Sequence, residues 1–190
     1  MPGRGPDRQD CLAARLTRRF GDVRVVHRLD MATSGLIVFA RGAEAQRTLS
    51  RAFAERAVEK RYMAVVDGAV ADDAGTIELP LLADWPNRPR QKIDLVAGKP
   101  STTHYRVVSR VAGRSNAAAT TRLELRPVTG RAHQLRVHLH AIGHSILGDA
   151  LYAPAPIRDA ANRLLLHATQ LRFAQPRDGT PVVAHSAVPF

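Results

Sequence analysis

The sequence predicts one α+β domain over residues 1–190, with a mixed, mainly antiparallel sheet and flanking helices. A chain of this length can bury a substantial core, and its 45% hydrophobic and 24% charged content is that of an ordinary globular protein. Segments rich in β-branched residues follow one another and are broken by single helical segments, rather than alternating strictly with helices. No internal repeat or linker divides the chain.

Three helices are expected from the spacing of apolar residues. Residues 12–20 have an apolar residue at every fourth position, between Asp10 as N-cap and Gly21 as a stop signal. Residues 43–56 and 131–142 have comparable spacing, and the second of these segments closes at a glycine.

The remaining ordered segments are expected to be strands, because β-branched and apolar residues lie between Gly, Pro and Asn breaks. The predicted strands are 36–40, 61–66, 76–79, 93–96, 102–111, 120–126, 164–173 and 182–184. Residues 84–90 contain two prolines and are expected to form an irregular loop.

Composition narrows the classes of partner and site. A net charge of +11 favours a phosphate-rich partner, although an arginine-rich coding bias alone would give the same charge. Cys11 is the only cysteine, which excludes an internal disulfide and a cysteine-ligated metal cluster. No apolar run is long enough to cross a bilayer, and the first residues form no secretory signal. We therefore expect a cytoplasmic protein without membrane contact.

Asp30 is the first candidate for chemistry. The segment 26–35 reads VHRLDMATSG and places Arg28 two positions before Asp30. A carboxylate in such a segment can be fixed by local hydrogen bonds while it stays open to a ligand. The competing interpretation is that Asp30 only caps the turn at Thr33.

The segment 130–144 reads GRAHQLRVHLHAIGH and is the second candidate. On a helix, His133, Arg136, His140 and His144 would share one face. Three histidines suggest a metal site, but a fixed cation among them and the lack of an acidic residue in the helix argue against one. We expect no metal here, and an arginine that pairs with a carboxylate from elsewhere in the fold.

Two further segments combine aromatic and basic residues. Lys60 and Arg61 precede Tyr62 at the start of a predicted strand, a combination that binds phosphate and stacks a nucleobase. The loop DWPNRPR likewise holds a tryptophan near Arg88 and Arg90. Both aromatic side chains would also be explained by packing in the core or at a sheet edge.

Together these segments resemble one family, the RluA-type pseudouridine synthases. Its four ordered motifs are matched by HRLDMATSGL, EKRYMAVVDG, GRAHQLRVHLHAIGHSILGDALY and RLLLHATQL. The segment LPLLADWPNRPRQKIDLVAGKPSTTHYRVV is similar to the short branch of the family, which acts on both 23S ribosomal RNA and tRNA. Several motifs in the right order are far more specific than any one alone.

The resemblance implies roles for individual residues. Asp30 matches the catalytic aspartate, and Arg28 matches the arginine that fills the gap left by the extruded base. Tyr62 matches the tyrosine that stacks on the pyrimidine, and Arg136 matches the arginine that ion-pairs with the catalytic aspartate. Further contacts with base and RNA are expected from Leu165, Leu166, Lys60, Arg61, Arg88, Arg90, Arg131 and His133.

The resemblance also implies a single catalytic domain with a central RNA-binding cleft, no S4-type RNA-binding domain, no cofactor and a monomer. Ala132 and Ser145 depart from the residues usual in the family at those positions. The family's N-terminal strand and its Lys-Pro loop are expected to be missing, since the match begins at residues 1–4.

Pseudouridylation detaches uracil from ribose and rejoins it through carbon, without redox change or group donor. Asp30 would act either by attack at C1′ or by removing a sugar proton. Two other functions stay open on the sequence alone: a metal-dependent RNA hydrolase using His133, His140 and His144, and a non-catalytic RNA-binding protein.

Overall fold

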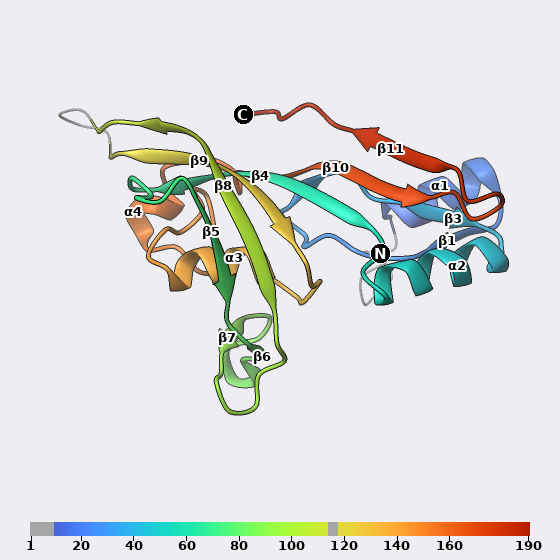
Figure 1. Cartoon of the computed structure of the whole chain (residues 1–190), viewed down its shortest axis with the longest axis horizontal. Coiled ribbons are helices and arrows are strands. Elements are labelled where there is room, and N and C mark those ends of the chain that lie inside the picture. Colours follow the sequence, from blue (N-terminus) through green and yellow to red (C-terminus); the bar gives the residue numbers. More distant parts are fainter. Residues whose placement is uncertain (1–9, 114–117) are drawn as a thin grey trace.

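The computed structural model describes residues 10–113 and 118–190. Its main sheet consists of β2 (Ser34–Gly35), β4 (Glu59–Asp67), β5 (Ala74–Glu78), β8 (Thr102–Val111), β9 (Thr120–Pro127), β10 (Leu166–Ala174) and β11 (Pro181–His185). The strand order is β11-β10-β4-β9-β8-β5, with β2 added beside β10 (Figure 1). Only the pairing of β2 with β10 is parallel, so the mixed, mainly antiparallel sheet is confirmed. The expected loss of an N-terminal strand concerns the part of the chain ahead of residues 1–4, which lies outside the described residues.

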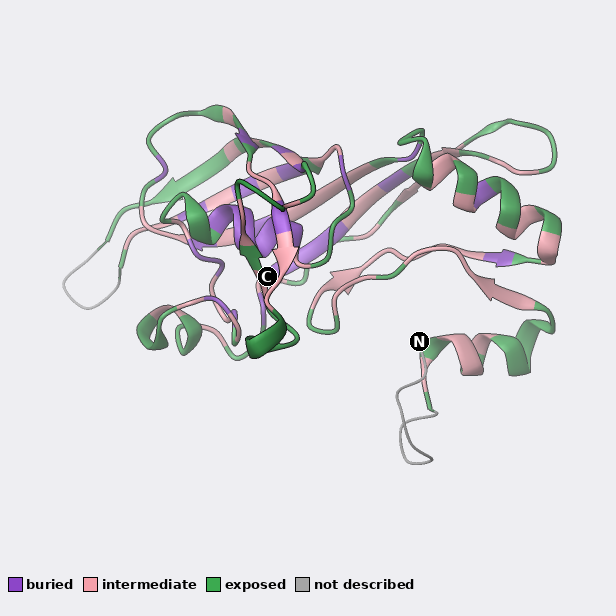
Figure 2. Cartoon of the chain, turned by 90° about the horizontal axis from the view of Figure 1, so that it is seen from below, coloured by how far each residue is buried: buried purple, intermediate pink, exposed green. Residues whose placement is uncertain are grey.

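The core lies where the middle of this sheet meets α3 (Gln134–Ala141). Every second residue of β9 is buried, as expected when one face of a strand packs against a core. Leu123 and Leu125 of this strand are 0% exposed, as is Leu139 of α3. Figure 2 shows the buried residues concentrated in this half of the molecule, whereas the helices of the other half are mainly intermediate or exposed.

Shorter elements flank the sheet. A two-stranded ribbon of β1 (Val23–Val25) and β3 (Phe39–Arg41) lies with the helices α1 (Leu12–Phe20) and α2 (Ala43–Ala54) at one end (Figure 1). A second ribbon of β6 (Leu81–Ala83) and β7 (Gln91–Ile93) projects from the other half and carries the short 3-10 helix η2 (Trp85–Asn87). The four-residue helix α4 (Ala155–Arg158) precedes β10. No helix in the described ranges is long and apolar enough to cross a membrane.

Two predicted strands are wrong in part. Within 36–40, only the last two residues belong to a strand, because the chain leaves β2 beside β10 and then joins β1 through β3. The segment 93–96 turns after Ile93, because the Asp94 carboxylate accepts hydrogen bonds from the backbone amides of Val96 and Ala97 at 3.1 and 2.9 Å. Val96 is therefore fully exposed rather than buried in a strand.

The predicted helices are confirmed with corrected ends. Asp10 does not cap α1: the N-cap is Cys11, and the Asp10 carboxylate binds the Arg15 guanidinium instead. The helix α3 begins at Gln134 rather than at residue 131, because His133 has a left-handed backbone (φ 53°) that cannot continue a right-handed helix.

Candidate active site

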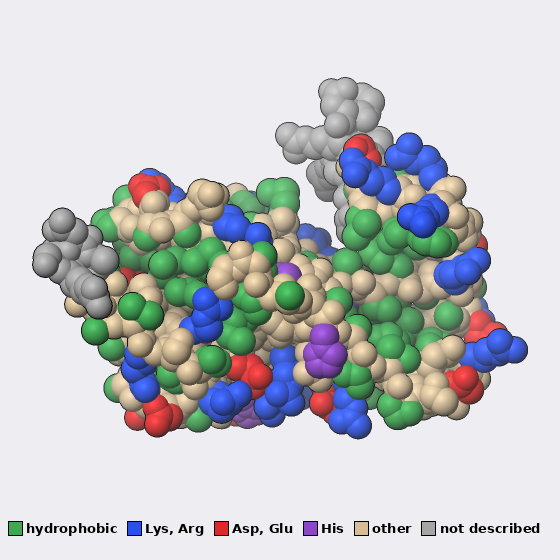
Figure 3. Space-filling model, turned by 90° about the horizontal axis from the view of Figure 1, so that it is seen from above, with side chains coloured by type: hydrophobic (Ala, Val, Ile, Leu, Met, Phe, Trp, Pro, Cys, Tyr) green, Lys and Arg blue, Asp and Glu red, His purple; other side chains and the backbone are tan. Residues whose placement is uncertain are grey.

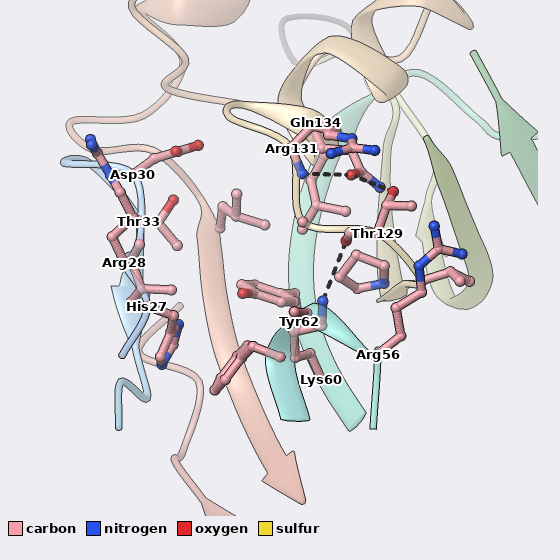
Figure 4. A pocket seen from close by; sticks show the side chains of 18 residues that line it. His27, Arg28, Asp30, Thr33, Arg56, Lys60, Tyr62, Thr129, Arg131 and Gln134 are labelled. Carbon is pink, nitrogen blue, oxygen red and sulfur yellow. Dashed lines mark hydrogen bonds between the residues drawn. The ribbon is translucent and has the colours of Figure 1, made fainter. Parts of the chain in front are cut away.

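A cavity of about 490 Å³ opens between the loop that follows β1 and the sheet (Figure 4). One wall is the segment around Asp30, and the opposite wall is the turn between β9 and α3. Strand β4 contributes Lys60 and Tyr62, and β10 contributes Leu166. Besides these residues and Asp30, the predicted site residues Arg28 and Arg131 line the cavity.

The Asp30 segment is held by its attachment to β10. The backbone amide of Thr33 donates to the carbonyl of Asp30 at 2.9 Å, which closes a turn before β2. Ser34 and His167 are hydrogen-bonded side chain to side chain at 2.8 Å. At Gly35 (φ 107°), a Cβ atom would lie 2.3 Å from the carbonyl oxygen of Ala168, so only glycine permits this close approach.

His27 anchors the other end of this segment, and sequence reasoning missed it. Its Nε2 accepts a hydrogen bond from the backbone amide of Val38 at 3.0 Å, and its ring stacks on Phe53 with centroids 4.4 Å apart. Burial and the positive charge of Lys60 lower the pKa of His27 to about 4, so the ring is neutral at physiological pH. The signal in the sequence was the histidine of HRLD, which motif matching left without a role.

Within the described ranges, the Asp30 carboxylate has no protein partner. Among the described residues, its side chain forms no hydrogen bond or ion pair, so it does not cap the turn at Thr33. In Figure 4 the carboxylate extends from its loop toward the wall that carries Arg131 and Gln134. A carboxylate placed in this way is available to a ligand.

Tyr62 lies between the two walls (Figure 4). Burial and the negative charge of Asp30 raise the pKa of its hydroxyl to about 12. The phenol is therefore neutral at physiological pH. Its ring offers an apolar face inside the cavity, and its hydroxyl lies within electrostatic range of the carboxylate.

The wall opposite Asp30 is a closed hydrogen-bond network. The hydroxyl of Thr129 donates to the Gln134 side-chain oxygen at 2.7 Å, and the backbone amide of Arg131 donates to the same oxygen at 3.0 Å. The Lys60 ammonium donates to the carbonyl of Thr129 at 3.3 Å. This network fixes the turn that precedes α3, so the wall is rigid before any ligand arrives.

The expected ion pair between Arg136 and Asp30 is not formed. Arg136 donates two hydrogen bonds to the Asp149 carboxylate, at 2.8 and 2.5 Å, and the two side chains are 4% and 1% exposed. Asp149 is held by the backbone amides of Leu151 and Tyr152, so its carboxylate is already oriented toward the guanidinium. Arg136 does pair with a carboxylate from elsewhere in the fold, but not with the one in the cavity.

The pair of Arg136 and Asp149 is nevertheless electrostatically linked to the cavity. Burial lowers the pKa of the Arg136 guanidinium, but the hydrogen bonds and charge of Asp149, with a smaller contribution from Asp30, outweigh it and leave that pKa raised. The charge of Asp30 thus acts on Arg136 without contact between the two side chains. Sequence reasoning missed Asp149 because nothing in the sequence connects it with Arg136.

Tyr152 contacts β7, His133 and the Arg136 side chain of the pair with Asp149. Its hydroxyl oxygen accepts a hydrogen bond from the backbone amide of Gln91 in β7 at 2.8 Å and is 2.6 Å from Nδ1 of His133. An oxygen that accepts from Gln91 can donate its own proton to Nδ1, which leaves Nε2 of neutral His133 as a donor. The guanidinium of Arg136 lies 5.1 Å from the centre of the Tyr152 ring.

The three histidines considered as metal ligands have separate partners. His133 binds Tyr152, whereas His140 Nδ1 binds the hydroxyl of Ser145 and His144 Nδ1 binds the carbonyl of Asp67. In the part of the chain that the structure describes, no three His, Cys, Asp or Glu side chains are grouped to hold a metal ion.

Several predicted RNA contacts lie outside the cavity. Arg61 points to the other face of β4 and pairs with Glu124 at 3.2 Å. Arg88 stacks on the exposed ring of Trp85, so that tryptophan does not pack into the core. Arg90 lies over Tyr152. Of the two candidate leucines, Leu166 lines the cavity, whereas Leu165 packs against the core from a partly buried position.

Basic residues do not form a single patch on the face shown in Figure 3. There the Lys and Arg side chains are spread among hydrophobic ones. Within the cavity, however, four basic residues face one acidic residue: Arg28, Arg56, Lys60 and Arg131 line it together with Asp30. The local excess of positive charge suits an anionic ligand.

Comparison with known proteins identifies the family. The family model of RNA pseudouridylate synthases matches residues 3–141. The dual-specificity RNA pseudouridine synthase RluA of Yersinia pestis is 48% identical over 96% of this chain and 86% of its own length. RluA of Escherichia coli K12 is 45% identical over the whole chain and 84% of its own length.

A solved structure agrees with these relatives. Human RNA Pseudouridylate Synthase Domain Containing 1 superposes with a TM-score of 0.79 at 34% identity, over 92% of this chain and 73% of that one. Its α+β architecture and the sequence relatives lead to one assignment. The chain therefore belongs to the RluA-type RNA pseudouridine synthases, enzymes that isomerise uridine in RNA to pseudouridine.

Proposed function

We propose that this enzyme modifies uridines in both tRNA and 23S ribosomal RNA, and that Asp30 carries the reaction. Support for the two substrates comes from relatives named dual-specificity RNA pseudouridine synthases, which are 43–48% identical to this chain over most of its length. The segment of residues 79–108, which contains Trp85, resembles the short branch of the family that acts on both RNAs. We infer a cytoplasmic protein, because both RNAs are cytoplasmic, and a monomer, as the resemblance to the family implies.

The reaction requires the uridine to leave the RNA stack, at a cost of a few kcal/mol. Stacking of the everted base on Tyr62 offsets about 1–3 kcal/mol of this cost. Leu166 provides an apolar contact in the cavity, and Arg28 fills the gap that the base leaves in the RNA. A cavity of about 490 Å³ has room for one nucleoside.

Asp30 acts at the ribose of the everted nucleotide. The bond between C1′ and N1 breaks, and its electron pair leaves with uracil. The Asp30 carboxylate either forms a bond to C1′, which breaks when C5 of the rotated base attacks C1′, or takes the proton from C2′, which it returns when C5 joins C1′. The proton on C5 is then released.

The single observation that carries this proposal is the free Asp30 carboxylate in a cavity that it shares with Tyr62. A carboxylate without a protein partner retains its nucleophilic and basic lone pairs for substrate. Paired carboxylates of this chain, such as Asp149, have no such freedom.

The experiment is to incubate the purified protein with transcripts of tRNA and of 23S ribosomal RNA domains and to map pseudouridine in each. We expect product in both RNAs, at a few defined positions. Product in only one RNA would refute dual specificity, and product in neither would refute the proposed activity. Cleavage of the RNA strand instead of isomerisation of uridine would favour the metal-dependent RNA hydrolase.

A further inference from the structure

We propose that the Lys60 ammonium is a further catalytic group, which stabilises the uracil anion released when the glycosidic bond breaks. This inference rests on the proposed function of Asp30, because that residue frees the base. Asp30 would act on the sugar, and Lys60 would act on the other product of the same bond cleavage.

The placement of Lys60 follows from the alternation of side chains along β4. Residues 60 and 62 project from the same face of the strand, whereas Arg61 projects from the opposite face and pairs with Glu124. Lys60 and Tyr62 therefore both line the cavity. A base that stacks on the Tyr62 ring lies beside the Lys60 side chain.

Lys60 has hydrogen-bonding capacity to spare. Its ammonium carries three donors, and one of them is used on the carbonyl of Thr129 at 3.3 Å. In the described part of the chain, it has no carboxylate partner within ion-pair distance. Figure 4 shows Lys60 and Asp30 at opposite ends of the cavity, so the carboxylate does not neutralise it.

The surroundings of Lys60 disfavour the charged form of its side chain. Burial and the positive charge of Arg56 lower the pKa of the ammonium below its usual range. A half-buried cation without a counterion is destabilising until an anion arrives beside it. Arg56 reinforces this field from the cavity wall, in a left-handed conformation (φ 62°) that is unfavourable for arginine.

The anion that the reaction itself produces meets these requirements. When the C1′–N1 bond breaks, its electron pair remains on uracil, and the negative charge is shared between N1 and the carbonyl oxygens O2 and O4. An ammonium donor to one of these oxygens stabilises the anion while the base rotates. The negative charge disappears when C5 bonds to C1′; the C5 proton is then lost and N1 takes up a proton. No oxidant, reductant or co-reactant is needed.

The position of Lys60 distinguishes this role from a phosphate contact. It is half-buried on the strand that carries the base-stacking Tyr62, whereas RNA phosphates remain at the mouth of a cavity that accepts an everted base. A donor aimed at developing charge in a partly dry site lowers the barrier of the chemical step. A phosphate contact would instead strengthen binding of the RNA and depend on salt.

The test compares Lys60→Met, which keeps the alkyl chain, with Lys99→Met, an exposed lysine that does not line the cavity. Single-turnover rates at saturating RNA, dissociation constants and thermal melts are measured for each, and Lys60→Ala is assayed with and without added ethylammonium. We expect Lys60→Met to lower the single-turnover rate by about 10²–10³-fold. Its RNA affinity and melting temperature should stay near those of wild type, and ethylammonium should restore part of the Lys60→Ala rate.

Two results would overturn the proposal. The first is an unchanged single-turnover rate in a folded Lys60→Met protein that binds RNA. The second is a defect confined to the dissociation constant, with a shallower dependence on salt, which would identify a phosphate contact. A wild-type protein that makes no pseudouridine would instead refute the proposed function, so the two failures are distinguishable.

Discussion

Replacement of Asp149 by asparagine should destabilise the fold by about 3–5 kcal/mol, because it leaves the Arg136 charge buried without a partner. The carboxylate accepts two hydrogen bonds from Arg136 and two from backbone amides, and both side chains are at least 96% buried. Asparagine keeps one oxygen for the amides but turns an N–H₂ group toward the guanidinium. For a chain of this size the loss corresponds to a fall in Tm of roughly 6–20 °C.

The assay is urea unfolding followed by circular dichroism at pH 7. Asp73→Asn is the matched control, because Asp73 pairs with Arg110 through a side chain that is 88% exposed. Such an exposed pair contributes about 0–1 kcal/mol. The reasoning would be refuted if both variants lost the same small amount, or if Arg136→Met combined with Asp149→Leu were as unstable as the sum of the single changes.

The same pair predicts a dependence on pH. Burial alone raises the pKa of Asp149, but the hydrogen bonds and charge of Arg136 outweigh it, so the folded-state pKa lies below the ordinary value of 3.8. The stabilisation is complete above that ordinary value and is lost as the pH falls through the folded-state pKa. Asp149→Asn should lack this acid-dependent loss.

Two other variants test the remaining parts of the site. The resemblance to the family also implies that the Tyr62 hydroxyl takes part in proton transfer. Tyr62→Phe should therefore keep the stacking surface, and hence RNA affinity, but slow product formation; equal turnover would remove the proton-transfer role. For His27, an unfolded-state pKa of 6.5 against about 4 in the fold means that the unfolded state takes up a proton first. Wild-type stability should fall by about 3 kcal/mol between pH 6.5 and 4 on this account, whereas His27→Phe should show a flatter profile over that range, measured by urea unfolding.

Local patterns predicted most of the elements but not all of their ends. The helix over residues 12–20 and the strand β8 follow from spacing and composition, which act over a few neighbours. The end of β7 depends on the side chain of Asp94, which competes with strand pairing. The start of α3 depends on the left-handed backbone of His133. The side chain of this residue is hydrogen-bonded to Tyr152, a tertiary contact.

The sequence predicted those site residues that lie in short motifs, but not the tertiary contacts between them. Asp30, Tyr62 and Lys60 come from two short segments that the sequence displays, and the fold brings them into one cavity. The partner of Arg136 was not predictable, because it depends on how the loop after α3 folds back onto the helix. Likewise, the anchoring of the Asp30 segment through His27 is a tertiary contact.

The measurement that tests the central claim most directly is release of tritium from RNA labelled at C5 of uridine, with wild type compared with Asp30→Asn. The label leaves only when C5 becomes bonded to the sugar. We predict release by wild type and none by Asp30→Asn, although the variant binds RNA with nearly unchanged affinity. Sustained tritium release by a folded Asp30→Asn protein would contradict the account.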